Sequence, residues 1–213
     1  MAARTPTRAR FHRGPRSLTL PIRTERLLLR PPADSDVERL VELMAEPSVA
    51  RGTLHVPFPY RRVDAVGWVR RAGRRLRAGS DLSLTVERRD EPGAIGGIGL
   101  HQFSEDGAEA ELGYWIGRPY RRQGFARESV EGVVDAGFHR LGLHRIVTSV
   151  FPFNRASASV LRGTGFRREG LAREVHRKDG EWRSEIRFAR LVTDPTPAGS
   201  GRKARPARRT RRV

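Results

Sequence analysis

The residues best suited to chemistry form one short run, Arg121-Arg122-Gln123-Gly124-Phe125-Ala126. An apolar stretch with strand-like alternation ends before this run, and an amphipathic helical pattern follows it. The start of a helix leaves several backbone N–H groups without partners, and these groups together with the helix dipole attract anions. Gly124 and the small Ala126 let a ligand approach the backbone, while Arg121 and Arg122 add positive charge. The run therefore predicts a phosphate-binding turn, although, taken alone, a surface turn with chance glycines and arginines is the simpler interpretation.

Other kinds of chemistry are excluded by residues that the chain lacks. No cysteine is present, which rules out disulfides, thiolate metal sites and a cysteine nucleophile. Neither lysine follows a glycine, so a P-loop is excluded, and Gln102 takes the place of the third glycine that a dinucleotide fingerprint at Gly97-Ile98-Gly99 would need. The sequence contains no His-Glu-x-x-His and no Gly-x-Ser-x-Gly. We therefore expect no metal site and no serine-hydrolase chemistry.

Helices alternate with strands and hairpins along residues 18–194, which predicts an α/β or α+β fold with a mixed sheet. The expected strands are Leu18–Leu20, Arg26–Arg30, Leu82–Arg88, Ala94–Gln102, Ala108–Gly117 and His144–Phe151, followed by a hairpin of Leu171–Arg177 and Trp182–Val192. The expected helices are one capped by Asp34 or Ser35 and then Val63–Ala78, Arg127–Leu141 and Asn154–Arg162. The proline-rich segment Glu46–Tyr60 is expected to be a loop.

Three further motifs accompany the turn in a fixed order. The domain opens with Thr24-Glu25-Arg26-Leu27-Leu28-Leu29-Arg30-Pro31, and Glu111-Leu112-Gly113-Tyr114-Trp115-Ile116 precedes the turn. Asn154-x-x-Ser157 with Gly165-Phe166 comes after it. Together with Arg121-x-x-Gly124-x-Ala126, these motifs resemble the GNAT superfamily of N-acetyltransferases, and the first two resemble its ribosomal-protein N-terminal (Rim-type) branch. The resemblance covers residues 20–192.

The resemblance implies both a fold and a co-substrate. The fold would be a twisted mixed sheet of about six or seven strands, flanked by helices and splayed into a V between Glu109–Gly117 and His144–Phe151. Acetyl-CoA would lie in the V, with its pantetheine on the backbone of Trp115, Ile116 and Gly117. Its pyrophosphate would sit on the amides of Arg121–Ala126, and Asn154 would contact the coenzyme arm.

Acetyl transfer to an amine needs a base for the ammonium proton, a donor for the thioester oxygen, and a proton or hydrogen bond for the departing thiolate. Glu111 is the candidate base, because it lies early on a strand that would flank the V and shares a face with Gly113 and Trp115. The resemblance supports this choice, since related enzymes often carry a carboxylate there. Pairing with one of the many arginines is the competing interpretation, and Glu109 on the same face is the alternative base.

Two positions depart from a pattern common among relatives. Ser149 stands where many relatives carry a glutamate, and Leu161 stands where many carry a tyrosine acid. Ser157 is the polar candidate that remains near the thiolate, although a hydroxyl is a poor proton source. Asn154 and Ser157 could also simply cap a helix as its N-cap and N3 residues. His176 on the last hairpin could touch the acceptor, but an exposed histidine is the expected case.

Positive charge is concentrated at the two ends of the 213-residue chain. The net charge is +18, yet residues 1–17 and 195–213 hold 12 basic residues and no acid, so residues 18–194 carry only +6 (30 basic minus 24 acidic). We expect disordered tails around one domain of residues 18–194. The tails could contact RNA or the ribosome, although a GC-rich genome would also explain the arginines. No apolar run approaches the ~20 residues of a membrane span, so we expect a cytoplasmic protein without membrane contact.

The sequence is compatible with three functions. The first is acetylation of a protein N-terminus, such as that of a ribosomal protein, and the Rim-type resemblance favours it. The second is the same chemistry on a small amine, such as an aminoglycoside or a polyamine, which acidic residues lining the cleft would favour. The third is a non-catalytic protein that binds RNA or the ribosome on the same scaffold. Monomer and homodimer are both compatible with the sequence.

Overall fold

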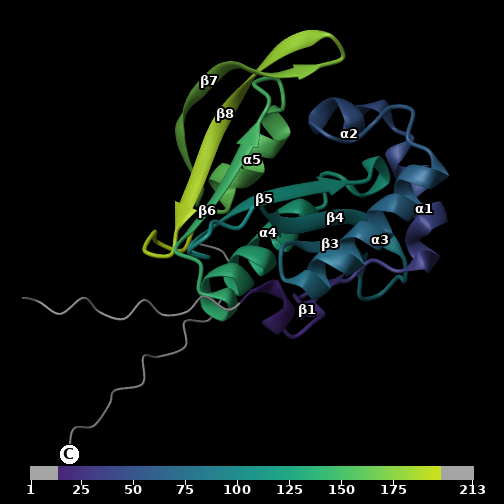
Figure 1. Ribbon diagram of the computed structural model, residues 1–213, viewed down its shortest axis with the longest axis horizontal. Helices are drawn as coiled ribbons and strands as arrows, with labels where there is room; N and C mark the ends of the chain where they lie inside the picture. Colours follow the sequence, from purple (N-terminus) through teal and green to yellow (C-terminus); the bar gives the residue numbers. More distant parts are fainter. Residues whose placement is uncertain (1–13, 198–213) are drawn as a thin grey trace, which may run out of the picture.

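An eight-stranded sheet organises the computed structural model, which describes residues 14–197 (Figure 1). In order across the sheet, the strands are β1 (Ile22–Arg23), β2 (Leu27–Arg30), β3 (Leu82–Arg88), β4 (Ala94–His101), β5 (Glu109–Ile116), β6 (Arg145–Val150), β8 (Glu181–Leu191) and β7 (Arg167–Lys178). All neighbours are antiparallel except β5 and β6, which are parallel. The mixed sheet expected from the sequence is confirmed, and it has eight strands where the resemblance implied about six or seven.

The sheet divides between its two parallel strands. Their pairing runs from Glu109–Arg145 to Glu111–Val147 and ends there, while β5 continues to Ile116 and β6 to Val150. At the point of division, Thr148 donates its hydroxyl to the carbonyl of Leu112 at 2.8 Å. Figure 1 shows β5 running on with β4 and β3 while β6, β8 and β7 turn away from them. The V expected from the resemblance therefore opens beyond Glu111 and Val147.

Helices cover both faces of the sheet (Figure 1). They are α1 (Val37–Met44), α2 (Pro47–Gly52), α3 (Arg62–Ala78), α4 (Phe125–Ala136) with a π-helical turn Gly137–Leu141, and α5 (Arg155–Gly163). Val130 and Val133 of α4 share a core with Ile95, whereas the neighbouring Ala94 packs with the residues of α1 and α3. Because successive strand residues point to opposite faces, α4 lies on one face of the sheet and α1 and α3 on the other.

Three expectations about local structure are wrong. The segment Glu46–Tyr60 contains the helix α2, which begins at Pro47 and is too short to show a helical period. Leu18–Leu20 is not a strand, and pairing begins after Pro21, which has no N–H to donate. Residues 15–17 form a 3-10 turn with Pro15 buried, so the domain includes part of the predicted N-terminal tail.

Within residues 14–197, no helix is long and apolar enough to cross a membrane.

Candidate functional site

The predicted phosphate-binding turn joins β5 to α4. After Ile116 the chain makes a single 3-10 turn and passes through Arg122 and Gly124, whose φ angles are +64° and +84°. Glu128 donates its N–H to the carbonyl of Gly124 at 3.0 Å, which closes the first turn of α4. The N–H groups of residues 125–127 therefore point outward without an intrahelical acceptor. The backbone thus has the geometry of an anion site at the position where the sequence predicted it.

The two arginines of the predicted turn have different surroundings. Arg121 donates from Nε to the carbonyl of Ile116 at 2.9 Å and from Nη1 to Ser48 Oγ at 2.8 Å, so it ties the turn to the end of β5 and to α2. Arg122 is exposed and is free to meet an anion in solvent. Arg121 therefore shapes the turn, while Arg122 is the one that can approach a ligand.

Arg26 is a further cation at the turn and was not among the predicted site residues. Its Nη1 donates to the carbonyl of Gln123 at 3.0 Å, and its guanidinium lies 4.7 Å from the centroid of the Phe125 ring. It also forms an ion pair with Glu128 at 2.7 Å. These contacts join residues that are about a hundred positions apart, so no local pattern could have indicated them.

The backbone of β5 is used differently from what the resemblance implied. Gly117 donates its N–H to the carbonyl of Ile95 on β4 at 2.9 Å, so this group is occupied within the sheet. The carbonyl of Leu112 instead accepts from Thr148 across the division. Because backbone direction alternates along a strand, Tyr114 and Ile116 direct their backbone groups toward the V, and Trp115 and Gly117 direct theirs toward β4. Of the three predicted backbone contacts, Ile116 is the one on the cleft side, where its carbonyl accepts from Arg121 Nε.

Tyr114 and Ser157 meet across the V. The Tyr114 hydroxyl lies 2.7 Å from Ser157 Oγ and 3.2 Å from the Ser157 carbonyl. Burial raises the pKa of Tyr114 to about 12, against the hydrogen bond with Ser157, so its hydroxyl stays protonated at neutral pH. Asn154 is the N-cap of α5, and its Oδ1 accepts from the N–H of Ser157 at 3.2 Å, as the capping interpretation predicted. Ser157 was a predicted site residue, whereas its partner Tyr114 was not.

The two candidate bases on β5 are in unlike environments. Glu109 pairs with Arg145 at 2.6 Å, and Arg145 also binds Glu169, so the alternative base is neutralised in an ion-pair cluster. Glu111 is half-buried at the last paired position before the sheet divides. Its pKa is raised, first by burial and then by the charge of Glu185, against the influence of His55 and His176. A carboxylate with a raised pKa is a better proton acceptor at neutral pH, so the geometry favours Glu111 over Glu109.

A buried carboxylate that was not among the predicted site residues lies beside Glu111. Glu185 on β8 accepts from His176 Nε2 at 2.8 Å and from Arg187 Nε at 3.0 Å. Burial would raise its pKa, but hydrogen bonds from His176, Ser149 and Arg187 lower it overall. Glu185 therefore brings a carboxylate next to Ser149, the position where many relatives carry their own. His176 is held by this contact rather than fully exposed, which corrects the expectation for it.

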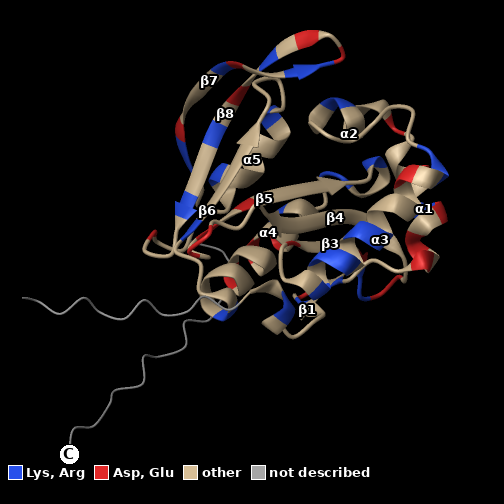
Figure 2. Ribbon diagram, viewed as in Figure 1, with Lys and Arg blue, Asp and Glu red and all other residues tan. Residues whose placement is uncertain are grey.

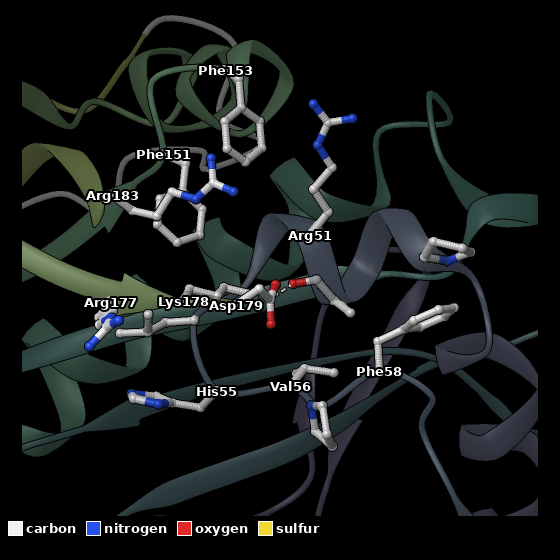
Figure 3. Close-up of a pocket in the computed structure, with 14 residues that line it drawn as sticks. Arg51, His55, Val56, Phe58, Phe151, Phe153, Arg177, Lys178, Asp179 and Arg183 are labelled. Carbon is white, nitrogen blue, oxygen red and sulfur yellow. Dashed lines mark hydrogen bonds between the residues drawn. The ribbon is translucent and has the colours of Figure 1, made fainter. Parts of the chain in front are cut away.

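A pocket of about 630 Å³ lies next to the open end of the V (Figure 3). Its walls are α2 with the following loop, the residues just after β6, and the turn between β7 and β8. His55 stands on this wall and is close enough to Glu111 to lower its pKa. The pocket therefore leads toward the candidate base from the side where an acceptor could enter.

Comparison with known proteins agrees with this geometry. Residues 26–167 match the acetyltransferase (GNAT) domain. YoaA, an N-acetyltransferase of Bacillus subtilis, is 32% identical over 161 residues, which cover 75% of this chain and 89% of the relative. The ribosomal protein uS5-alanine N-acetyltransferase of Escherichia coli is 28% identical over 184 residues, which cover 82% and 92%. Mycobacterium smegmatis RimJ, solved in complex with CoA-disulfide, shares the fold with a TM-score of 0.72 at 22% identity, over 78% of this chain and 82% of that one.

The matched segment runs from the start of β2, through the division of the sheet and the phosphate-binding turn, to the start of β7. Its relatives include a ribosomal-protein N-acetyltransferase, as the Rim-type motifs predicted. The chain therefore belongs to the GNAT acetyltransferase family and is an acetyl-CoA-dependent N-acetyltransferase.

Proposed function

We propose that this N-acetyltransferase modifies the N-terminal amine of a protein, with a ribosomal protein as the acceptor class to test first. The observation that carries the proposal is the charge of the pocket. Four basic residues line it, namely Arg51, Arg177, Lys178 and Arg183, and Asp179 is the one acidic residue among the described residues that do so. A polyamine or an aminoglycoside, which carries several positive charges, would be repelled there more strongly than a peptide that carries a single reactive amine. The Escherichia coli relative that acts on a ribosomal protein supports the same choice.

The residues around the V fit the co-substrate. Acetyl-CoA supplies an acetyl group that is already activated as a thioester. The free N–H groups of residues 125–127, the glycine backbone at Gly124 and the exposed Arg122 can hold its pyrophosphate. The backbone groups of Tyr114 and Ile116 line the edge of β5 along which its arm would run.

Glu111 would accept the proton of the acceptor ammonium, directly or through one water. Its half-buried position and the nearby Glu185 raise its pKa, which improves its match to an amine at neutral pH. The amine then attacks without any covalent intermediate on the enzyme, which suits a chain without cysteine.

On the other side of the V, Ser157 and Tyr114 would stabilise the departing thiolate. Each hydroxyl can donate a single hydrogen bond, and their mutual contact of 2.7 Å fixes the position of both. Because Tyr114 keeps its proton at neutral pH, its hydroxyl can donate to Ser157 Oγ. The Ser157 hydroxyl is then free to donate toward the V. Ser157 would be the group that contacts the thiolate, and Tyr114 would position it.

The full-length chain should be assayed for release of coenzyme A with acetyl-CoA and two acceptor panels. One panel holds peptides with the N-terminal sequences of ribosomal proteins, and the other holds polyamines and aminoglycosides. We expect turnover with peptides and acetylation at the α-amine, located by mass spectrometry. Turnover confined to the small amines, or no turnover with any of the peptides, would overturn the proposal.

A further inference from the structure

The acceptor pocket is a fixed part of the fold, because a lysine joins its two walls. Lys178, at the turn between β7 and β8, donates from Nζ to the carbonyl of Ala50 at 2.7 Å and to that of Thr53. These carbonyls lie in α2 and directly after it. The contact spans more than a hundred residues of sequence and holds the hairpin against α2. The groups that line the pocket are therefore positioned before any acceptor arrives.

Three arginines line the pocket, and the guanidinium groups of Arg51 and Arg183 are the candidates to bind a ligand, because Arg177 lies away from Phe151 and Phe153 in Figure 3. Arg51 stacks over the ring of Phe153 at 5.1 Å and, within residues 14–197, it pairs with no carboxylate. Arg183 pairs with Glu181, whose side chain is 67% exposed, so solvent competes for that contact. In Figure 3 the guanidinium of Arg51 lies beside Phe153, and Arg183 lines the same pocket. Lys178, by contrast, is occupied by its two carbonyls.

The stacked arrangement presents Arg51 in the way that suits a carboxylate. The rings of Phe151 and Phe153 are themselves stacked, with centroids 5.4 Å apart, which supports the face on which Arg51 rests. A guanidinium that lies on a ring keeps its in-plane N–H groups free, and these match a carboxylate in a bidentate contact. Phe58 and Phe153 are both more than two-fifths exposed and offer apolar surface for the rest of an acceptor chain.

We infer that the acceptor carries acidic side chains within the first few residues after its reactive amine, and that Arg51 and Arg183 bind them. This inference rests on the proposed function and adds the substrate class. A neutral peptide would leave Arg51 without a carboxylate and Arg183 with only its exposed partner Glu181, and a basic peptide would meet like charge at the entrance. The same anionic chemistry could come from a small amino acid, so the test includes that source.

The test compares three short peptides that share an N-terminal serine and differ in the next two residues, which are Glu-Asp, Gln-Asn or Lys-Lys. Free aspartate, free glutamate and spermidine complete the panel, and the enzyme is the full-length chain. We expect kcat/KM for the acidic peptide to exceed that of the neutral peptide by about tenfold, with the basic peptide lowest. The advantage should shrink as ionic strength rises, because the contacts are partly exposed.

Substitutions of Arg51 and Arg183 test whether these residues cause the preference for the acidic peptide. Arg51→Gln and Arg183→Gln should each raise KM for the acidic peptide by about three- to tenfold, more than they raise KM for the neutral peptide, with the coenzyme A affinity unchanged. Arg51→Glu should shift the preference toward the lysine peptide. Arg74→Gln is the matched control, because Arg74 is an exposed arginine of α3 outside the pocket and should have no effect.

The outcomes separate this inference from the proposed function. Equal turnover of the three peptides, or an acidic preference that survives Arg51→Gln and Arg183→Gln, would overturn the inference and leave the proposed function standing. Rapid acetylation of free aspartate or glutamate without turnover of any peptide would overturn both. Turnover of spermidine above all peptides would do the same.

Discussion

The pKa of Glu111 depends on burial and on charged residues of other elements rather than on its own strand. Burial and the charge of Glu185 raise its pKa, while His55 and His176 act in the opposite direction. If it is the base, Glu111→Gln should lower the rate by about 10²–10⁴. The affinity for coenzyme A, measured by calorimetry, should be unchanged. Glu109→Gln is the matched control, because Glu109 is neutralised by Arg145. Near-normal turnover of Glu111→Gln would rule out Glu111 as the base.

The pH dependence of the reaction should also report this environment. Glu111 must be ionised to accept a proton, so kcat/KM falls as the pH drops through its raised pKa. Glu185→Gln removes the negative charge that helps to raise this pKa, and the acidic limb of the profile should therefore move to lower pH. Profiles of kcat/KM for the two proteins, measured with one peptide, provide the check. An acidic limb that does not move would mean that another group controls it.

The contact between Tyr114 and Ser157 can be tested by a double-mutant cycle. Ser157→Ala should lower kcat about tenfold by removing a hydrogen bond to the thiolate, and Tyr114→Phe should lower it by a similar or smaller factor by releasing Ser157. Because the two hydroxyls act as one unit, the double variant should be little worse than Ser157→Ala alone. KM for acetyl-CoA should change less than kcat. Effects that multiply would show that the two hydroxyls act independently.

At the scale of elements, the junction of β5 with α4 is the feature most exposed to a single backbone change. Gly124 has a φ of +84°, which a β-branched residue adopts only under strain, and its Cα stands at the opening of the anion site. We expect Gly124→Val to abolish coenzyme A binding in calorimetry. The matched control is Gly93→Val in the turn between β3 and β4, which also has a positive φ and lies away from the junction. Gly93→Val should lower the melting temperature and keep coenzyme A affinity.

The phosphate site can be probed a second way without backbone strain. Ala126→Glu places a negative charge in the first turn of α4, where the pyrophosphate is expected, and should weaken coenzyme A binding by like-charge repulsion. The loss should be smaller at high ionic strength. If both Gly124→Val and Ala126→Glu bind coenzyme A normally, the phosphate site lies elsewhere.

Sequence patterns predicted elements with a clear period and missed features that depend on distant contacts. The strand Leu82–Arg88 was predicted with its observed bounds, and α3 began one residue before its expected start, because both have regular apolar spacing. The helix α2 has six residues and shows no period. Glu185, Arg26 and Tyr114 join the site through partners that lie far away in the sequence, so their proximity depends on tertiary packing alone.

At the scale of the whole molecule, the charge is divided unevenly between the fold and its ends. In Figure 2 basic and acidic residues alternate along the ribbon of the sheet and helices, in keeping with the modest net charge of residues 18–194. Residues 1–13 and 198–213 lie outside the described part of the chain, so the predicted tails stay a prediction from sequence. Pro15 and Leu18 are buried, and Pro197 lies against Gly165, which makes residues 14–197 the smallest unit to keep intact.

We expect the tails to be dispensable for acetyl transfer and to bind RNA. Residues 202–212 contain seven cationic side chains separated by small residues, proline and threonine, a pattern without an apolar stripe. Seven phosphate contacts would give a log–log salt dependence with a slope of about −5 to −6. Binding should therefore be strong at low salt, weak at physiological salt and independent of RNA sequence. A chain of residues 14–197 should keep its turnover on a free peptide while losing at least about tenfold in RNA affinity at low salt. Equal RNA binding by the truncated and full-length chains would place the basic contact on the fold, where the exposed arginines of α3 would be the next residues to change.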